Sequence, residues 1–447
     1  MNIQMVNLPY SLYSALNYFN NISHLPWSML LYSGNSDHRY NRFDIIVADP
    51  FLTFITYNDN TIIVGKNKKY VSKEDPFELL KYEMKAINFS TSCNHDLPFQ
   101  GGAVGIYSYD IIRRIECLSN KAINELHCPD MAIGIYLWGL IVDHHKKNVT
   151  LFSYQDIKKR LLWLKQQVPW NSKKFEINGS WHSNMTKDQY YDKYNIINDY
   201  LHNGDCYQIN LAQRFKVAYH GDEWNAFLKL NTLNKAPFSA FIRLPSNCII
   251  SLSPERFLFL YNKIIQTRPI KGTLPKLDND IDDYKQIKRL QLSSKDRAEN
   301  VMIVDLLRND IGKVAIPGSI TVPEIFLVES FASVHHLVST IQGKLLPEYH
   351  PLDLLKACFP GGSITGAPKI RAMEIIEQLE PHRRHIYCGT IGYISFCGTM
   401  DTNITIRTLL TENNFIYCWG GGGIILDSIV DKEYQEIFDK LKTILSI

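Results

Sequence analysis

The sequence lacks paired cysteines, since none of its nine cysteines lies in a C-x-x-C pair or in zinc-finger spacing. An odd, scattered set in a chain of 447 residues is typical of reduced thiols in the cytosol. The N-terminus also lacks the basic flank and apolar core of a signal peptide. The longest apolar run, Met131 to Val142, has 12 residues and is too short to span a bilayer. We therefore predict a soluble, cytoplasmic protein that does not interact with a membrane. We expect the run over 131–142 to form one buried strand.

An excess of charge of either sign is missing as well. The formal net charge is +3 and no long stretch concentrates lysine and arginine, which argues against a nucleic-acid partner. Gly361 and Gly366 have the separation of a phosphate-binding loop, but Ala367-Pro368 follows them instead of Lys-Ser/Thr. No cysteine has the G-x-C-x-G surroundings of a glutaminase nucleophile, and the chain shows no pyridoxal-phosphate signature. These absences argue against a Walker-type phosphate-binding loop, against a glutaminase activity of the chain's own and against pyridoxal-phosphate chemistry.

The chain divides into two sequence regions joined by a polar connection. Residues 1 to about 155 alternate short strand-like runs with turns, which is typical of half of an antiparallel sheet system. The composition shifts between about 155 and 183, and the second region, 186–447, alternates helices with strands. We expect a helix over 76–86 in the first region. Within the second region we expect helices over 284–310 and 351–358, strands near 320 and over 326–338, one strand over 401–410 and a glycine loop over 420–423.

Two ionisable residues stand at constrained bends. Lys271 lies between Pro269, which fixes a backbone dihedral, and Gly272, which lets a ligand approach the backbone closely. A lysine amine is a nucleophile only when neutral, and burial or a neighbouring cation lowers its pKa. A solvated lysine beside a turn is the ordinary alternative. Glu255 lies at a strand junction, where the alternative is a surface carboxylate paired with Arg256.

Two pairs of acidic residues have helical spacing. Asp296 and Glu299 are three residues apart in the predicted middle helix, and Glu433 and Glu436 are three residues apart in the last one. Each pair faces one side of its helix, so two facing helices would make an oxygen-rich site suited to Mg²⁺. Solvent-exposed charge remains the alternative for each pair taken alone.

Other groups are suited to an anionic ligand. The backbone N–H groups of residues 421–423 and the helix start at Pro368 are both able to bind a carboxylate. Arg407 stands in an otherwise apolar stretch, and a buried arginine needs an anionic partner such as a carboxylate. A purely structural turn is the alternative for the glycines.

Nine long motifs together resemble the chorismate-utilising enzymes, and the match covers nearly the whole chain. The motifs are SPERF at 253–257, TRPIKGT at 267–273, KDRAENVMIVDLLRNDIG at 295–312, HHLVSTI at 335–341, FPGGSITGAPKIRAMEIIE at 359–377, GYISFCG at 392–398, ITIRT at 404–408, GGGI at 421–424 and EYQEIFDK at 433–440. The resemblance implies an α+β fold in which two antiparallel β-sheets pack face to face with helices outside. Residues 1–155 and 186–447 would both contribute to that shared core.

The resemblance implies a reaction on chorismate, a ring with two carboxylates and a C4 hydroxyl. Lys271 matches the family's nucleophile, which attacks C2 while the C4 hydroxyl leaves. Glu255 matches the general acid that protonates the leaving hydroxyl, a role that requires a raised pKa. Ammonia would then add at C4 and expel the lysine, giving 4-amino-4-deoxychorismate.

The resemblance also implies a Mg²⁺ cofactor and a set of substrate contacts. Glu299 and Glu436 match the Mg²⁺ ligands, with Asp296 and Glu433 as nearby or water-mediated contributors. The ion would neutralise the ring carboxylate and order the site. Positions that match substrate contacts or line the site are Gln208, Gly272, Thr273, His336, Thr365, Tyr393, Arg407, Gly421, Gly422, Gly423 and Lys440.

Two positions separate the branches of this family. The anthranilate-forming branch carries alanine at the position of Lys271, and the isochorismate- and salicylate-forming branches carry a basic lysine at the position of Gln208. The combination found here favours the aminodeoxychorismate-forming branch of p-aminobenzoate and folate biosynthesis. The alternatives are an anthranilate-forming component and a non-catalytic, tryptophan-binding regulatory subunit. A non-catalytic subunit would be expected to have lost residues at the catalytic and metal positions, but Lys271, Glu255, Glu299 and Glu436 are all present.

Two further partners follow from the resemblance. Ammonia would come from a separate glutamine amidotransferase subunit, because the chain has no glutaminase motif of its own. Bound L-tryptophan would occupy a pocket of the N-terminal region. The resemblance implies a structural role for it, and we infer no regulatory role. The residues that match the lining of this pocket are Ser33, Tyr40, Asn41, Arg42, Phe43, Pro237, Phe238 and Ser239.

Overall fold

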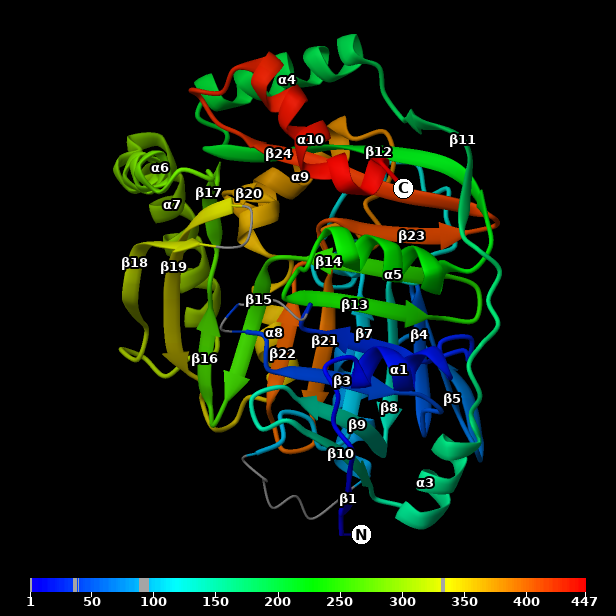
Figure 1. Cartoon of the computed structure of the whole chain (residues 1–447). Helices are drawn as coiled ribbons and strands as arrows, with labels where there is room; N and C mark the ends of the chain where they lie inside the picture. Colours follow the sequence, from blue (N-terminus) through cyan, green and yellow to red (C-terminus); the bar gives the residue numbers. More distant parts are fainter. Residues whose placement is uncertain (1, 35–37, 39, 88–95, 331–333) are drawn as a thin grey trace.

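Two twelve-stranded antiparallel sheets form the body of the protein (Figure 1). The computed structural model describes residues 2–34, 38, 40–87, 96–330 and 334–447. Apolar side chains of the two sheets meet in one core, and helices lie outside, which confirms the predicted α+β fold class. Each sheet contains strands from before residue 155 and from after residue 186.

The first sheet has the strand order β1-β10-β9-β3-β2-β13-β14-β23-β24-β12-β11, and the short β20 pairs with β12. The bounds of these strands are β1 (Gln4–Leu8), β10 (Asn148–Ser153), β9 (Trp138–Asp143), β3 (Phe43–Val47), β2 (Met29–Tyr32), β13 (Phe238–Arg243), β14 (Cys248–Ser253), β23 (Thr408–Glu412), β24 (Phe415–Ile424), β12 (Gln208–His220), β11 (Glu176–Ser183) and β20 (Gly366–Ala367).

The second sheet has the order β17-β19-β16-β15-β22-β21-β7-β8-β4-β5-β6, and β18 also pairs with β19. The bounds are β17 (Ile270–Pro275), β19 (Val334–Lys344), β16 (Ile264–Thr267), β15 (Arg256–Tyr261), β22 (Met400–Asn403), β21 (Thr390–Ser395), β7 (Gly102–Tyr107), β8 (Met131–Tyr136), β4 (Leu52–Tyr57), β5 (Asn60–Gly65), β6 (Lys68–Ser72) and β18 (Thr321–Ser330). The strands β18 and β19 stand where one strand over 326–338 was expected, and residues 331–333 of that stretch lie outside the described residues.

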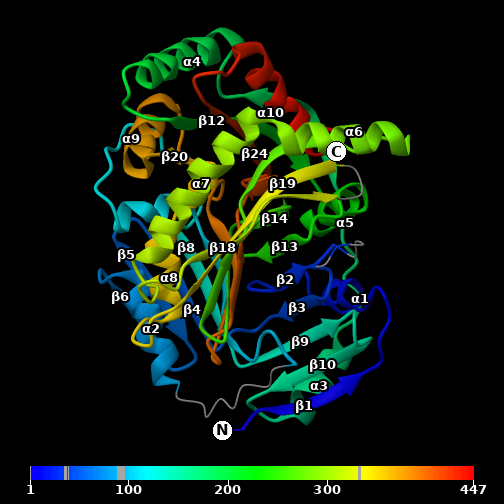
Figure 2. The same ribbon diagram turned by 90° about the vertical axis from the view of Figure 1, so that its left-hand side faces the viewer.

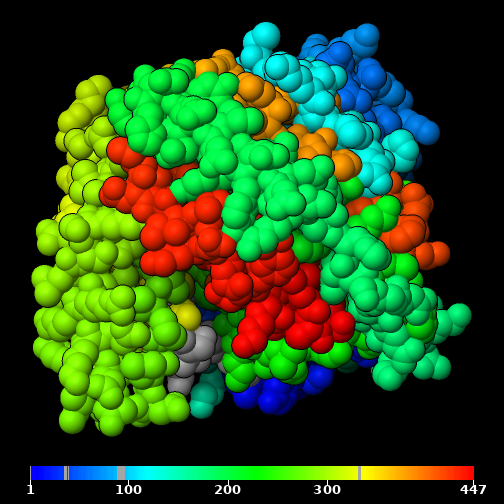
Figure 3. All heavy atoms as spheres, turned by 90° about the horizontal axis from the view of Figure 1, so that it is seen from above, coloured from blue at the N-terminus to red at the C-terminus, as the bar shows by residue number. Residues whose placement is uncertain are grey.

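The helices are α1 (Ser14–Asn20), α2 (Pro76–Ala86), α3 (Ile157–Gln166), α4 (Lys187–His202), α5 (Glu223–Leu233), α6 (Asp280–Leu292), α7 (Ser294–Gly312), α8 (Pro351–Cys358), α9 (Lys369–Leu379) and α10 (Val430–Leu445), with short 3₁₀ helices η1 (Tyr109–Arg114) and η2 (Gly362–Ile364). The apolar faces of α1, α4, α5, α9 and α10 pack on the outer face of the first sheet, whereas α2, α7 and α8 pack with the second (Figure 2). Seen from above, α10 lies between α4 and the α6–α7 pair (Figure 3).

The eight cysteines among the described residues are free thiols, and Cys93 lies outside those residues. None of the helices in the described ranges is long and apolar enough to cross a membrane.

The chain changes sheets at two places where the sequence predicted an unbroken strand. The apolar run over 131–142 forms β8 in the second sheet and β9 in the first, with Leu137 between them. The strand expected over 401–410 is likewise divided between β22 and β23, and Arg407 lies in the connection with a φ of 51°. Both halves of each run are buried, so the hydrophobic pattern does not change where the chain crosses.

Ser293 divides the helix that was expected over 284–310 into α6 and α7. Its backbone is extended, with a ψ of 111°, and its side-chain oxygen accepts a hydrogen bond from the backbone N–H of Asp296 at 3.2 Å. Serine is a favoured N-cap because its oxygen satisfies an N–H group that has no partner within the helix. Ser293 therefore ends α6 and starts α7, whose first turn carries Asp296.

Residues 420–423 belong to β24 and not to a loop. They pair with residues 210–213 of β12, whereas β23 pairs only with residues 415–418 of β24. A Cβ atom on Gly420 would lie 2.8 Å from side-chain atoms of Ile437 and Leu441, both on α10. Glycine at this position therefore lets α10 lie close against the strand.

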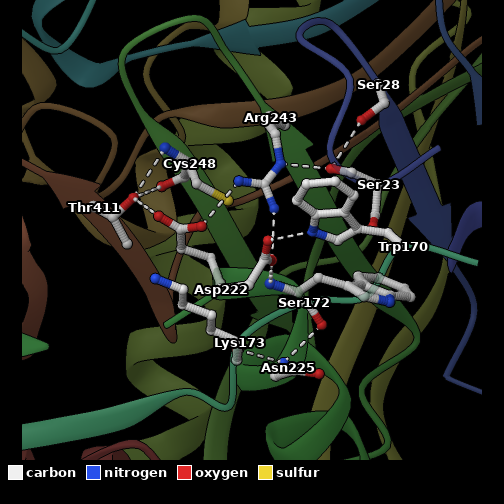
Figure 4. Close-up of polar contacts among 12 residues, drawn as sticks. Ser23, Ser28, Trp170, Ser172, Lys173, Asp222, Asn225, Arg243, Cys248 and Thr411 are labelled. Atoms are coloured by element: carbon white, nitrogen blue, oxygen red, sulfur yellow. Dashed lines mark hydrogen bonds and ion pairs between the residues drawn. The ribbon is translucent and has the colours of Figure 1, made fainter. Parts of the chain in front are cut away.

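A polar network fastens the connection between the two sequence regions to the first sheet (Figure 4). Arg243 of β13 donates to the carbonyl oxygen of Ser23 and, at 2.8 Å, to the carboxylate of Asp222. Asp222 also accepts a hydrogen bond from the Trp170 indole at 2.9 Å and caps the N-terminus of α5. Trp170 of the polar connection is thus held against the start of α5 by a hydrogen bond to Asp222.

Candidate functional site

Lys271 is the second residue of β17, at the edge of the second sheet. Its Nζ atom donates a hydrogen bond to the backbone carbonyl oxygen of Ser363 at 3.0 Å. Burial lowers the pKa of Lys271, and the carboxylates of Glu299 and Glu255 offset this effect only in part. A lysine with a lowered pKa has a larger neutral fraction, so the site suits a nucleophilic amine.

Glu255 lies where the chain leaves β14 of the first sheet and enters β15 of the second. Its side chain is buried, and its Oε1 atom accepts a hydrogen bond from the hydroxyl of Ser363 at 2.8 Å. Burial raises the pKa of Glu255, although the Ser363 hydrogen bond and the charge of Lys271 act in the opposite direction. The alternative of a surface pair with Arg256 is wrong, because Arg256 pairs with Asp401 at 2.8 Å.

Ser363, on η2, is a residue that motif reasoning did not assign to the site. Its carbonyl oxygen contacts Lys271 and its hydroxyl contacts Glu255. The surrounding loop is held by Thr365, whose hydroxyl donates to the carbonyl oxygen of Gly361 at 3.0 Å. The only sequence signal for Ser363 is its position within the 359–377 motif, beside a pair of glycines.

The two acidic pairs lie on helices that face the same region. Burial raises the pKa of Glu299 on α7, with repulsion from Asp296 and Glu433 adding to the effect. Burial also raises the pKa of Glu433 on α10, and the neighbouring charge of Glu436 adds to it. The two helices therefore bring their carboxylates within electrostatic reach of each other and of Lys271. For Glu299 and Glu433, this rules out the alternative of independent, solvent-exposed charges.

Lysines balance part of this negative charge. The Nζ atom of Lys440 lies 2.6 Å from Glu436, and Lys295 lies 3.9 Å from Glu433. Lys440 also donates to the carbonyl oxygen of Gly421 at 3.1 Å. Within the described ranges, no three His, Cys, Asp or Glu side chains are grouped closely enough to hold a metal ion. The oxygen donors have the chemistry that Mg²⁺ prefers, and their mutual repulsion fits a bound cation.

Glycines let two strands approach these acidic side chains closely. At Gly272, with a φ of 81°, a Cβ atom would lie 2.9 Å from the Cγ atom of Asp296. At Gly422 a Cβ atom would lie 3.1 Å from an oxygen of Glu433. Both glycines therefore bring backbone next to carboxylate, and the first also needs a backbone conformation that favours glycine.

Three predicted residues form a second group beside β17. The hydroxyl of Thr273 lies 2.8 Å from the Nδ1 atom of His336. Burial lowers the pKa of His336 to about 3, and the positive charge of Arg407 contributes. Burial also lowers the pKa of Arg407, whose side chain has no hydrogen bond or ion pair with any residue that the structure describes. Arg407 is partly buried, and a guanidinium of this kind is suited to bind a carboxylate ligand.

Gln208 lies at the start of β12, opposite the glycine stretch. A Cβ atom on Gly423 would lie 2.0 Å from its Nε2 atom, so glycine leaves room for this side chain to pass. The Gln208 Oε1 atom is buried and has no hydrogen-bond partner among the described residues. A buried acceptor of this kind is suited to a ligand that donates hydrogen bonds.

A separate cavity of about 410 Å³ lies between the two sheets. Seven of the eight predicted tryptophan-binding residues line it, and the eighth, Asn41, accepts a hydrogen bond from Ser33 at 2.9 Å. Arg256 also lines the cavity, and its guanidinium lies 4.4 Å from the ring centroid of Tyr40. The residues of this set, which lie far apart in the sequence, therefore meet at one cavity.

Tyr393, which the sequence placed with the chorismate-binding positions, lines this cavity. It lies on β21, lines the cavity beside Asp401, and packs edge-on against Phe99. Alternation along β21 directs this side chain toward the space between the sheets.

A hydrogen bond links the lining of the cavity to the segment that carries Lys271. Tyr40, which lines the cavity, accepts a hydrogen bond from Arg268. Arg268 is buried, three residues before Lys271, and its guanidinium also pairs with Glu329 at 2.7 Å. Arg268 thus connects the lining of the cavity to the strand that follows it, which carries the candidate nucleophile Lys271.

Comparisons with known proteins agree with this arrangement. A family profile described as chorismate binding enzyme matches residues 29–446. The chain is 55% identical to "Aminodeoxychorismate synthase component 1" of Escherichia coli (strain K12), covering 96% of this chain and 94% of that protein. It is 53% identical to the protein of the same name in Salmonella typhimurium, covering 99% and 97%. The solved anthranilate synthase component I from Streptococcus pneumoniae TIGR4 is similar over 90% of this chain and 92% of that chain, with a TM-score of 0.81 and 31% identity.

Proposed function

Because the chain belongs to the family of chorismate-binding enzymes, we propose that it converts chorismate and ammonia to 4-amino-4-deoxychorismate. The relatives in Escherichia coli and Salmonella typhimurium carry the name of this activity. The observation that carries the proposal is the convergence of Lys271 and Glu255 on Ser363, which holds an amine and an acid next to each other.

The reaction proceeds through a covalent bond between the ring and Lys271. The neutral amine forms a bond from Nζ to C2, the ring double bonds shift, and the C4–oxygen bond breaks. Glu255 gives its proton to the departing hydroxyl, which leaves as water. Ammonia then bonds to C4, the Nζ–C2 bond breaks, and the proton released from the new ammonium group returns to Glu255. Lys271 ends as the neutral amine with which it began.

The substrate carboxylates are held away from this pair. Arg407 is a partly buried cation with no partner among the described residues, which supports a charge-assisted contact to one carboxylate. The charge of Arg407 reaches His336, which is neutral because burial lowers its pKa to about 3. Thr273 is hydrogen-bonded to His336, so both are available as hydrogen-bonding groups. Such contacts orient the ring so that C2 meets Lys271 and C4 meets Glu255.

Mg²⁺ is the proposed cofactor, held by Glu299 and Glu436 with Asp296 and Glu433 close by. When bound, it supplies positive charge that neutralises a substrate carboxylate. Burial is the main cause of the raised pKa values of Glu299 and Glu433, and the charge of Glu433 on α10 adds to the effect on Glu299 of α7. Isothermal titration calorimetry with MgCl₂ tests this site in the absence of substrate. Binding that persists unchanged in Glu299→Gln would rule these ligands out.

The cavity between the sheets is the proposed site of bound L-tryptophan. Its volume of about 410 Å³ and its lining by Tyr40, Phe43 and Phe238 suit an aromatic amino acid. Native mass spectrometry of the purified protein tests for the ligand. Phe238→Ala is expected to lose it, whereas Phe415→Ala, which removes a ring on β24 that does not line the cavity, is expected to retain it.

Ammonia is proposed to come from a separate glutamine amidotransferase subunit in p-aminobenzoate and folate biosynthesis. The protein is therefore expected to use free ammonium salts alone and glutamine only together with that subunit. Glutamine-dependent activity of the isolated chain would contradict this arrangement.

The identity of the product separates this function from the alternatives. The purified protein is incubated with chorismate, MgCl₂ and ammonium chloride, and the product is identified by liquid chromatography with mass spectrometry. Aminodeoxychorismate is expected. Anthranilate with pyruvate would assign the chain to the other amination branch, and consumption of no chorismate would favour a tryptophan-binding regulatory subunit.

A further inference from the structure

We propose that Ser363 is a positioning residue that holds the acid Glu255 and the nucleophile Lys271 in one shared geometry, an inference that rests on the proposed function. The residue contacts the two groups through different atoms. Its hydroxyl donates to Glu255 Oε1 at 2.8 Å, and its backbone carbonyl accepts from Lys271 Nζ at 3.0 Å. A side-chain substitution therefore removes the first contact and leaves the second.

The first contact selects the oxygen of Glu255 that carries the proton. A protonated carboxyl has one oxygen that bears hydrogen and one that serves mainly as an acceptor. Because Ser363 donates to Oε1, the acid proton resides on Oε2, where it is available to a leaving group. Without the hydroxyl, the proton is able to occupy either oxygen of Glu255. The O–H group is then no longer directed toward the leaving group in every molecule.

The second contact orients the amine of Lys271. A neutral amine that donates one N–H to the Ser363 carbonyl keeps its lone pair free for bond formation. Since the carbonyl and the hydroxyl belong to one residue, the distance between nucleophile and acid is set by a single rigid unit. Geometry of this kind is what intramolecular catalysis requires.

The loop that carries Ser363 is fixed from behind. Arg384 is buried and donates to the carbonyl oxygen of Ile364 at 3.1 Å, while it pairs with buried Glu380 at 2.6 Å. A Cβ atom on Gly362 would lie 2.6 Å from the side chain of Leu306 on α7, so the loop lies directly against that helix. Ser363 is therefore held in a loop that is fixed between Arg384 and α7.

The charges around the pair come from three elements. Lys271 on β17 and Lys440 on α10 face Glu255, whose carboxyl also accepts a hydrogen bond from the backbone N–H of Ile270. Glu299 on α7 and Glu436 on α10 face Lys271. None of these groups is altered by a substitution of the Ser363 hydroxyl, so its effect on Glu255 is separable.

The test is Ser363→Ala, assayed with chorismate, MgCl₂ and ammonium chloride. We expect kcat to fall by about tenfold or more while KM changes by about twofold at most. The limb of the kcat/KM profile that reports Glu255 should move to higher pH, because the carboxyl has lost a donor that favours its charged form. Ser363→Thr keeps the hydroxyl and should restore both the rate and the profile. Ser251→Ala removes another buried serine hydroxyl, on β14, and should leave both unchanged.

A double-mutant cycle separates positioning from a general loss of structure. If Ser363 acts through Glu255, Ser363→Ala has no further effect on the residual rate of Glu255→Gln. Independent, multiplicative losses would overturn the inference, as would a loss of rate in Ser363→Ala with an unmoved pH profile. If Ser363→Ala does not fold, as judged by circular dichroism, Ser363→Cys, with a weaker donor, replaces it and must give the same profile shift to support the inference.

The inference and the proposed function fail differently. If Glu255→Gln retains full activity, Glu255 is not the acid and the proposed mechanism fails. If Glu255→Gln is inactive but Ser363→Ala has the kcat and pH profile of the unmodified protein, only the positioning role of Ser363 is contradicted.

Discussion

Gly272 lies so close to Asp296 that a Cβ atom at position 272 would stand 2.9 Å from the carboxyl carbon. This contact joins β17, one residue beyond Lys271, to the first turn of α7. The φ of Gly272 is 81°, in the left-handed region that residues with a Cβ atom occupy only at a cost in conformational free energy. The glycine thus meets two separate requirements, one of backbone conformation and one of space beside Asp296.

Replacing Gly272 with alanine separates these requirements. We expect a loss of about 1–2 kcal/mol of unfolding free energy from the left-handed backbone. Because the side chains of Asp296 and Leu290 must also move, we expect kcat/KM to fall by about tenfold to a hundredfold. Urea unfolding and steady-state kinetics measure the two effects.

Gly318→Ala is the matched control for this substitution. Gly318 has a similar φ of 77°, but nothing lies within 4 Å of the position its Cβ would take. A comparable loss of stability with unchanged kinetics is therefore expected. Equal kinetic losses in the two variants would show that the contact with Asp296 has no role in activity.

Glu255→Gln is expected to change the pH dependence of stability. Burial raises the pKa of Glu255, so with rising pH the unfolded chain loses this proton first. Above the unfolded pKa the folded state binds more protons, and the contribution of this group to stability falls as the pH rises through the folded pKa. Glutamine does not titrate, so the variant should be more stable than the unmodified protein at about pH 8 and similar to it at about pH 4.

Urea unfolding across this pH range measures the effect. Glu348→Gln, a substitution of an exposed glutamate, should leave the curve unchanged. A stability difference between Glu255→Gln and the unmodified protein that is constant with pH would contradict the raised pKa of Glu255.

Arg407→Ala tests the role of this partly buried guanidinium. Loss of a charge-assisted contact with a substrate carboxylate should lower kcat/KM by about tenfold to a hundredfold, mostly through KM. Arg407→Lys keeps the charge but loses the planar fork of donors, so an intermediate effect is expected. Arg308→Ala, at an exposed position of α7, should have normal kinetics. An unchanged KM in Arg407→Ala would exclude the residue from substrate binding.

Elements with strong local signals could be predicted from the sequence almost to the residue. The helices Pro76–Ala86 and Pro351–Cys358 both begin with proline, which is suited to the first helical position, after a capping residue. The two changes of sheet could not be predicted, because strands on both sides of Leu137 are equally buried. Which strand pairs with which is decided by the tertiary structure, and local hydrophobicity carries little information about it.

The residues of the candidate site likewise include some that could be predicted from the sequence and some that could not. Residue types with distinctive chemistry, such as Lys271, Glu255 and Arg407, could be named from motifs before the structure was known. Ser363 could not, because one of its two contacts is made by a backbone carbonyl, which every residue has. Tyr393 lines the cavity between the sheets, and its motif gives no information about which side of β21 it faces.

The most direct test of the central claim is intact-mass spectrometry of the protein with chorismate and MgCl₂ in the absence of ammonia. A chorismate-derived adduct is expected, mapped by peptide analysis to Lys271 and absent from Lys271→Ala. Addition of ammonium chloride should discharge the adduct and release aminodeoxychorismate. Full aminodeoxychorismate-forming activity in Lys271→Ala would contradict the assignment of Lys271 as the nucleophile.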